Sequence, residues 1–210
     1  MLFLGMGIPA VFGAKPSVAI DVQPPKIEHN TFEPGHPPPI LQRAPGEEAA
    51  FCHTTYWCHS GLSAATPRFN FGRLVAQVTS VIVSTTLHII VWTPEGGPTE
   101  YFAHEETHRA IAEHYYDRYA KEVATRLAKK LAGKKIELSR KNAQAELDAA
   151  LKELEDRFIA DYNREVGDRN AFAQERFDSI TDHGRDPIAN EEARDRAIAD
   201  EEAHWKRGER

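Results

Sequence analysis

The sequence has no block of basic residues and no internal repeat. Its 26 Lys and Arg residues are mixed with 32 Asp and Glu residues along most of the chain, which leaves a mild net charge of −6. Because nucleic-acid binding needs clustered Lys and Arg, this composition argues against a nucleic-acid partner. Hydrophobic residues make up 41% of the 210 residues, which is enough to build the core of one domain with tails.

The sequence also lacks an apolar segment at its start that could cross a membrane. Residues 1–14 are apolar and uncharged, but a spanning helix needs about 20 such residues, so no stable membrane span is expected. An apolar run followed by small residues is typical of a secretory signal peptide, although the basic residues that usually precede the run are missing here. We therefore predict that residues 1–14 are a signal peptide and that the protein is exported.

Cysteine is scarce, since only Cys52 and Cys58 are present. In an exported protein, two cysteines this close in the sequence most simply form one local disulfide, which is our prediction. Each cysteine is followed by a histidine, His53 or His59. A small site with two cysteine and two histidine ligands is therefore the alternative.

Proline is concentrated in residues 15–50, and seven prolines lie between residues 24 and 45. Proline removes backbone donors and favours extended geometry, so we predict an arm or linker on the surface rather than a part of the core. The folded domain is then expected to span residues 51–210. Within it, β-branched and aromatic residues dominate residues 69–92, and the stretches 81–83 and 89–92 are predicted to be strands.

The rest of the chain has the pattern of helices. Thr99 is a suitable N-cap for a long helix, and Gly133 and Gly167 are suitable stops for this helix and the next. The expected helices cover residues 99–132, 138–166 and 171–181, and a polar tail from about residue 190. The predicted fold is α+β, with a short antiparallel strand region, a long helix, and a second helix that pairs with it as a hairpin.

The long helix carries the motif His104-Glu105-Glu106-Thr107-His108. Residues four apart on a helix lie about 40° from one another around the axis, so His104 and His108 can bind one zinc ion. Glu105 lies about 100° from His104, where it can act on a water molecule without binding the metal. Histidine, glutamate and histidine in this order are typical of zinc metallopeptidases, in which the glutamate is the general base.

A catalytic zinc ion usually has three protein ligands, so a third must come from elsewhere in the chain. His114 lies six residues after His108, which is the spacing of metzincins. That spacing requires the helix to end between the two histidines, usually at a glycine, but here Ile111 continues it. The continued helix places His114 about 120° from His108, which makes it the weaker candidate.

His183 is the stronger candidate for the third ligand. It follows the predicted helix of residues 171–181, and Gly184 allows a turn that would direct the imidazole inward. Asp178 or Asp182 could then accept a hydrogen bond from the other ring nitrogen. We predict one zinc ion per chain, bound by His104, His108 and His183.

Three motifs together resemble the DUF922 family of bacterial, predicted secreted zinc-dependent proteases over about residues 65–200. They are His104-Glu105-x-x-His108, Ile111-Ala112-Glu113, and Phe177-Asp178-x-x-Thr181-x-His183-Gly184. The resemblance implies a zincin-like (gluzincin-like) minimal peptidase with a few strands before the active-site helix, in a periplasmic or secreted bacterial protein. Phe177 stands where the family usually has tyrosine, so a hydroxyl that could polarise the substrate carbonyl is absent.

The sequence therefore predicts a zinc metallopeptidase that acts on a peptide or protein, with Glu105 as its general base. One alternative is a non-catalytic envelope protein that has a structural or vestigial metal site and uses the helical hairpin for interactions. Another is a zinc hydrolase that acts on a different bond, such as an amide of the cell wall. The sequence does not define the substrate or the oligomeric state.

Overall fold

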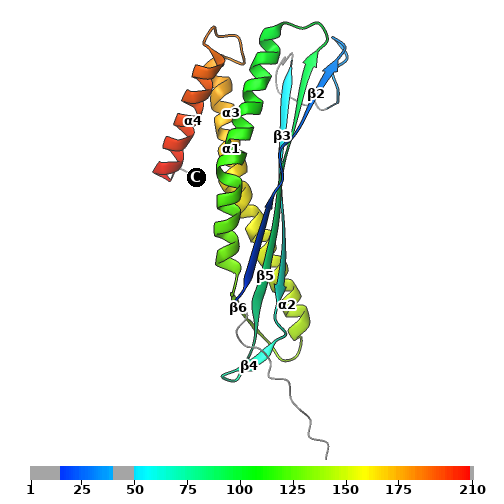
Figure 1. Ribbon diagram of the computed structural model, residues 1–210, viewed down its shortest axis with the longest axis vertical. Helices are drawn as coiled ribbons and strands as arrows, with labels where there is room; N and C mark the ends of the chain where they lie inside the picture. The colour runs from blue at the N-terminus through cyan, green and yellow to red at the C-terminus, as the bar shows by residue number, and fades with distance from the viewer. Residues whose placement is uncertain (1–14, 40–49, 209–210) are drawn as a thin grey trace, which may run out of the picture.

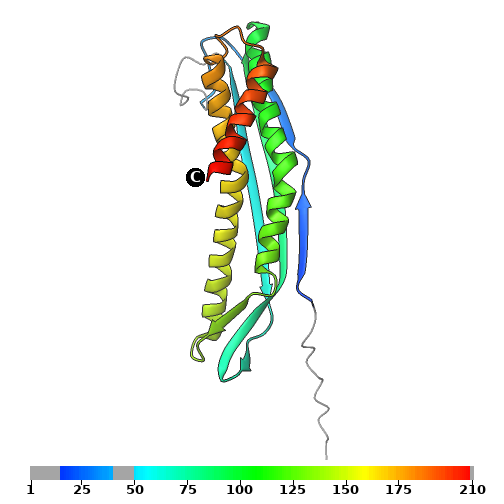
Figure 2. The same ribbon diagram turned by 90° about the vertical axis from the view of Figure 1, so that its left-hand side faces the viewer.

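The computed structural model of the protein describes residues 15–39 and 50–208, so the predicted signal peptide lies outside the described residues. The molecule is elongated, and helices cover one face of a sheet (Figures 1 and 2). Along the chain the elements are β1 (Ser17–Val22), β2 (Lys26–Phe32), β3 (Phe51–Ala64), β4 (Arg68–Asn70), β5 (Arg73–Pro94), α1 (Thr99–Leu131), β6 (Lys135–Leu138), α2 (Ala143–Tyr162), the π-helix η2 (Asn163–Gly167), α3 (Asp168–Thr181) and α4 (Asn190–Arg207).

The sheet is built around β5, a strand of 22 residues that pairs with every other strand. Strand β3 runs antiparallel to β5 along one edge. Strands β1 and β2 lie end to end along the other edge, and both run parallel to β5. Strands β4 and β6 pair antiparallel with the start of β5. The prediction of an α+β fold is confirmed, but the expected short antiparallel region is a long mixed sheet.

Residues 15–50, predicted to be an arm or linker, contribute β1 and β2 to this sheet. Side chains of both strands, among them Ile20 and Ile27, pack against the hydrophobic core. Pro24 and Pro25 fall between the two strands, where a missing backbone donor breaks no ladder bond. Strands β1 and β2 are therefore part of the folded domain, which begins well before residue 51. The prolines lie between the two strands and do not prevent either from pairing in the sheet.

Strand β5 and helix α1 form the main core. Every second residue of β5 from Val81 to Val91 is buried, and the residues between them face the other side of the sheet. The two predicted strand stretches are parts of this single strand. Helix α1 agrees closely with the predicted helix of residues 99–132, and Gly133 follows it with a left-handed φ of 83°. Alanines on the inner face of α1, such as Ala120 and Ala124, allow it to pack closely on the sheet.

The second predicted helix differs from the structure at both ends. The chain first forms β6, because Ile136 is buried against the start of β5, and α2 begins only at Ala143. Gly167 does not end the helix, since it has a helical φ of −69° and a π-helical turn joins α2 to α3. The chain from α2 to α3 returns alongside α1, which gives the predicted hairpin (Figure 1).

Among the helices that the structure describes, none combines the length and the apolar composition that a membrane span requires.

Helix α4 lies across α1 and α3 on the side away from the sheet (Figure 2). A second, smaller core fills the space between these three helices. It consists of buried residues from all three, namely Ile111, Tyr115, Ala173, Phe177, Ala193 and Ala197. This second core lies beside the histidines of the sequence motif, because Phe177 contacts both of their rings.

The predicted disulfide between Cys52 and Cys58 is wrong, since both cysteines are free. They lie on the same strand, β3, opposite Val91 and Thr85 of β5. Six residues of extended strand separate their Cα atoms by roughly 20 Å, whereas a disulfide needs about 4.4–6.8 Å. The alternative metal site fails for a related reason, because successive side chains of a strand point to opposite faces. His53 and His59 therefore point away from the cysteines.

Reducing agents should leave the thermal stability of the protein unchanged, because no disulfide restrains the described chain. Burial raises the pKa of the Cys58 thiol to about 12, so it should react slowly with thiol reagents in the folded protein. Titration with such a reagent after unfolding, without prior reduction, should detect two thiols per chain. A lower melting temperature on reduction, or no free thiol after unfolding, would contradict this assignment.

Candidate metal centre

His104 and His108 project from the same side of α1, toward α3. Both side chains are largely buried, and their Nε2 atoms are 3.1 Å apart. Their rings meet edge to face, with centroids separated by 4.7 Å. The structure therefore brings the two histidines of the motif together, as their spacing on a helix predicts.

Asp178 of α3 completes a group of three potential metal ligands, His104, His108 and Asp178, which we call the metal group. Its Oδ1 atom lies 3.2 Å from Nε2 of His104 and 2.9 Å from Nε2 of His108. Zinc binds nitrogen and oxygen at about 2.0–2.2 Å, so neighbouring ligands of a tetrahedral ion are about 3.3 Å apart. The three atoms can therefore share one such ion with little adjustment. Among the described residues, no other group of three or more such side chains has its ligand atoms this close together.

The electrostatics of this group favour a bound cation. Burial would raise the pKa of Asp178, but hydrogen bonds from His104 and His108 and their charges hold it well below its ordinary value. Burial would lower the pKa of His108, but its hydrogen bond to Asp178 and the charges of Asp178 and Glu105 raise it above its ordinary value. The carboxylate thus stays ionised, and the group is suited to a proton or a metal ion placed between the three side chains.

The rings of His104 and His108 rest on Phe177, which is fully buried. Phe177 stacks on His104 with a centroid separation of 4.8 Å and meets His108 edge to face at 4.9 Å. Its ring thus forms part of the wall that supports the two imidazoles. Phe177, which stands where the resembled family usually has tyrosine, therefore supports the two imidazole rings by packing.

His183, predicted to be the third ligand, is not a member of the group. Its Nδ1 atom lies 3.9 Å from Oδ1 of Asp178, and 53% of its side chain is exposed. Asp182 and His183 both have left-handed backbone conformations, with φ of 46° and 55°. The turn continues to Gly184, whose backbone packs so closely on His104 that a Cβ atom there would lie 3.2 Å from Nδ1. The turn thus holds His183 beside Asp178 at the surface.

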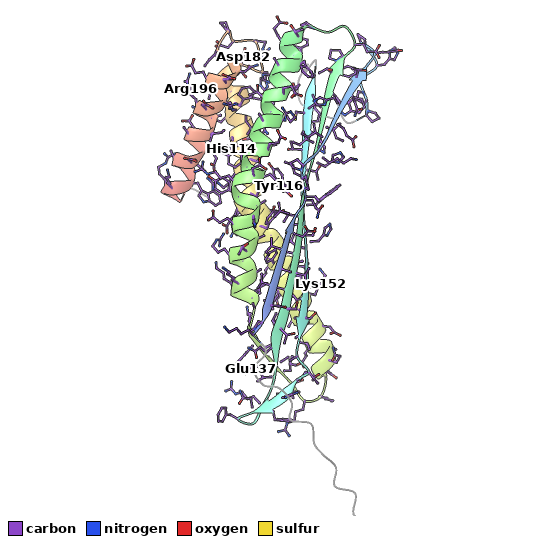
Figure 3. All side chains as sticks on the ribbon, viewed as in Figure 1. His114, Tyr116, Glu137, Lys152, Asp182 and Arg196 are labelled. Atoms are coloured by element: carbon purple, nitrogen blue, oxygen red, sulfur yellow. The ribbon has the colours of Figure 1, made fainter. Side chains whose placement is uncertain are left out.

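A surface pocket of about 400 Å³ adjoins the group on this side. It is lined by Asp178 and His183 together with Glu175, Ser179 and Asp182. Asp182, labelled in Figure 3, marks this turn at the end of the molecule where α1 begins. The metal group therefore borders the protein surface through Asp178, and His183 lies at the edge of the pocket rather than among the ligands.

His114, the alternative third ligand, lies on a different side of α1. It lines another surface pocket of about 400 Å³ together with residues of α4, including Arg194 and Glu202. Burial and the positive charge of Arg118 lower its pKa. Helix α1 continues without a break through this region. The metzincin-like arrangement is therefore not present, because Ile111 and its neighbours continue the helix, as the sequence predicted.

Glu105 is buried but lies outside the group of three ligands. Its charge contributes to the raised pKa of His108. Burial is the main reason why the pKa of Cys52 on β3 is raised, and the charge of Glu105 adds to it. The Glu105 carboxylate is thus close enough to influence both the metal group and the upper part of β3.

Sequence reasoning treated Asp178 as a partner of a ligand rather than as a ligand. One signal could have identified it, namely the spacing of Asn170, Gln174 and Asp178. These polar residues recur every fourth position, which places them on one stripe of a helix. In the structure this stripe faces His108, with contacts from both Gln174 and Asp178.

No family model, curated protein or solved structure matches this chain.

Proposed function

We propose that the protein is a zinc metallopeptidase with a zincin-like domain. The proposal rests on one observation above all: His104, His108 and Asp178 present three ligand atoms within 3.2 Å of one another, next to the buried Glu105. Two histidines and one carboxylate are a ligand set of catalytic zinc sites, which keep a fourth position open. The pocket beside Asp178 and His183 supplies access from the surface.

The proposed chemistry divides between the ion and Glu105. When bound, zinc would polarise a water molecule and the carbonyl group of the substrate. Glu105 accepts the proton of the attacking water on its carboxylate and later donates it to the leaving amine. Burial of Glu105 beside the ligands, but not among them, suits a group that moves a proton. His183 borders the pocket, where it would contact the substrate rather than the ion.

Glu105→Gln should keep one zinc ion per chain but lower hydrolysis of a protein substrate such as casein by at least about 100-fold, because general base catalysis typically contributes 10²–10⁴-fold. Metal analysis and a hydrolysis assay on the purified protein measure the two effects separately. The matched control is Glu106→Gln. Glu106 accepts hydrogen bonds from His29 and Arg109 on the other side of the helix, so this variant should remain active.

The outcomes separate the hypotheses. Full hydrolytic activity in Glu105→Gln would exclude the proposed mechanism. One zinc ion per chain without hydrolysis of any peptide by the wild-type protein would favour a structural metal site in an interaction protein. Absence of zinc, even after the metal is added, would reject the metal site itself.

A further inference from the structure

Gln174 contacts His108 on the side of the ring that faces away from the other two ligands. Its Oε1 atom is hydrogen-bonded to Nδ1 of His108. Its Nε2 atom donates to the backbone oxygen of His108 at 2.9 Å and to Oδ1 of Asn170 at 3.1 Å. Asn170 is itself buried, one helical turn earlier on α3. One side chain thus holds both the ring and the backbone of His108.

These contacts fix the orientation of the Gln174 amide. The backbone oxygen of His108 can only accept a hydrogen bond, so the atom of Gln174 that faces it must be the amide nitrogen. The amide oxygen must then face Nδ1 of His108. Because an oxygen of this kind only accepts, Nδ1 must carry a hydrogen atom. When a metal ion replaces the hydrogen on the other ring nitrogen, Nε2 is then the nitrogen that offers its lone pair.

Nε2 of His108 faces Asp178 and His104, at 2.9 Å from Oδ1 and 3.1 Å from the other Nε2, and in the metal-free site it donates its hydrogen to Asp178. The orientation of Gln174 therefore determines that the nitrogen next to the other ligands is the one able to bind a metal ion. Histidines that bind metals are commonly oriented in this way by a partner on the other ring nitrogen.

His104 has no such partner. Its Nδ1 atom is buried and has no hydrogen-bond partner among the described residues. Its ring is instead confined by packing, between the stacked ring of Phe177 and the backbone of Gly184. Of the two histidines, only His108 thus has a side chain that accepts a hydrogen bond from Nδ1.

We propose that Gln174, itself anchored by Asn170, is a positioning residue that keeps a hydrogen atom on Nδ1 of His108, leaves Nε2 for the metal ion, and thereby sets the affinity of the site for that ion. The inference depends on the metal site proposed above, but its test does not depend on hydrolysis. Loss of an outer partner of a metal-binding histidine typically lowers the affinity for the metal by about 10–100-fold.

The first measurement is whether Nδ1 of His108 carries a hydrogen atom in the metal-free protein, read from the ring nitrogen signals of ¹⁵N-labelled histidine. The wild-type protein should show this hydrogen on Nδ1, where it is donated to Gln174. Gln174→Met keeps the approximate shape of the side chain but removes the acceptor, so Nδ1 should lose the hydrogen in at least part of the molecules. A wild-type ring without a hydrogen on Nδ1 would overturn the proposal directly, even if Gln174→Met does not fold.

The second measurement is the zinc affinity, obtained by competition with a chelator. Gln174→Met should bind zinc about 10–100-fold more weakly than the wild-type protein. Gln174→Glu keeps an oxygen that can accept the hydrogen bond from Nδ1, so its affinity should be closer to that of the wild type. The matched control is Gln144→Met on α2, where the exposed amide contacts only Asp148 among the described residues, and its affinity should be unchanged.

Equal zinc affinity in Gln174→Met and the wild-type protein would overturn the proposal, whereas the site itself would stand. If the wild-type protein bound no zinc, the proposed metal site would fail, and the ring nitrogen signals would still test the role of Gln174. The two failures are therefore distinguishable.

Discussion

Asp178→Asn is expected to lower the zinc affinity by more than the 10–100-fold that is typical for loss of an outer partner, because it removes the charge of a proposed direct ligand. It keeps the volume of a side chain that is only 26% exposed, so the packing between α1 and α3 should survive. If the proposed site binds zinc, a zinc concentration about 100 times the Kd stabilises the folded state by about 2.7 kcal/mol. In a chain of this size that corresponds to a rise in Tm of roughly 5–10 °C. The variant should lose most of this rise.

His183→Ala provides the decisive comparison. It should retain the zinc-dependent rise in Tm, since His183 lies outside the group of ligands. Asp182→Asn is the matched control for the change of charge, because Asp182 is exposed and forms an ion pair only with Arg185 among the described residues. Loss of zinc binding in His183→Ala together with retention in Asp178→Asn would restore the ligand set that the sequence alone predicted.

Glu201→Gln should destabilise the protein by about 3–5 kcal/mol, which is typical when one partner of a buried ion pair is removed. Only 1% of Glu201 is exposed, and its carboxylate accepts hydrogen bonds from Arg169 at 2.6 and 2.8 Å and from Tyr115 at 3.0 Å. The guanidinium of Arg169 also lies over the ring of Tyr119, 4.1 Å from its centroid. Without the carboxylate, Arg169 would remain buried and uncompensated. These contacts join α4 to α1 and α3, so their loss should also loosen the metal group.

Urea unfolding measures the change in the free energy of unfolding. Glu153→Gln is the matched control, because its ion pair with Arg157 is exposed on α2 and should contribute at most about 0.5 kcal/mol. The double variant Arg169→Met with Glu201→Leu should be more stable than Glu201→Gln alone, since apolar replacement of both partners leaves no buried charge. Equal stability of Glu201→Gln and the wild-type protein would show that α4 contributes little to the fold.

The sequence predicted the features that depend on neighbouring residues. The spacing of His104 and His108 required only that their segment be helical, and α1 agrees closely with its predicted limits. The β-branched run of β5 was likewise visible as strand. The prolines misled the prediction for residues 15–50, because composition alone does not distinguish a linker from two strands that prolines separate.

The third ligand could not be predicted in the same way. Asp178 lies 70 residues after His108, and its approach depends on how α3 packs against α1. The choice of His183 relied on the chemistry of one loop and on the flexibility of Gly184. The structure instead places Gly184 against the ring of His104, and His183 is left half-exposed beside the group.

By itself, the sequence determined that a helix would present two histidines to one side, because helical geometry relates residues one turn apart, with a glutamate about 100° around the axis. Only the tertiary structure decided what meets them. The π-helical turn allows α2 to continue into α3 through Gly167, and α4 clamps α3 to α1 through Arg169 and Glu201. This packing brings Asp178 to the histidines. A contact between residues so far apart in the chain is set by tertiary packing and not by local periodicity, so the sequence alone did not determine it.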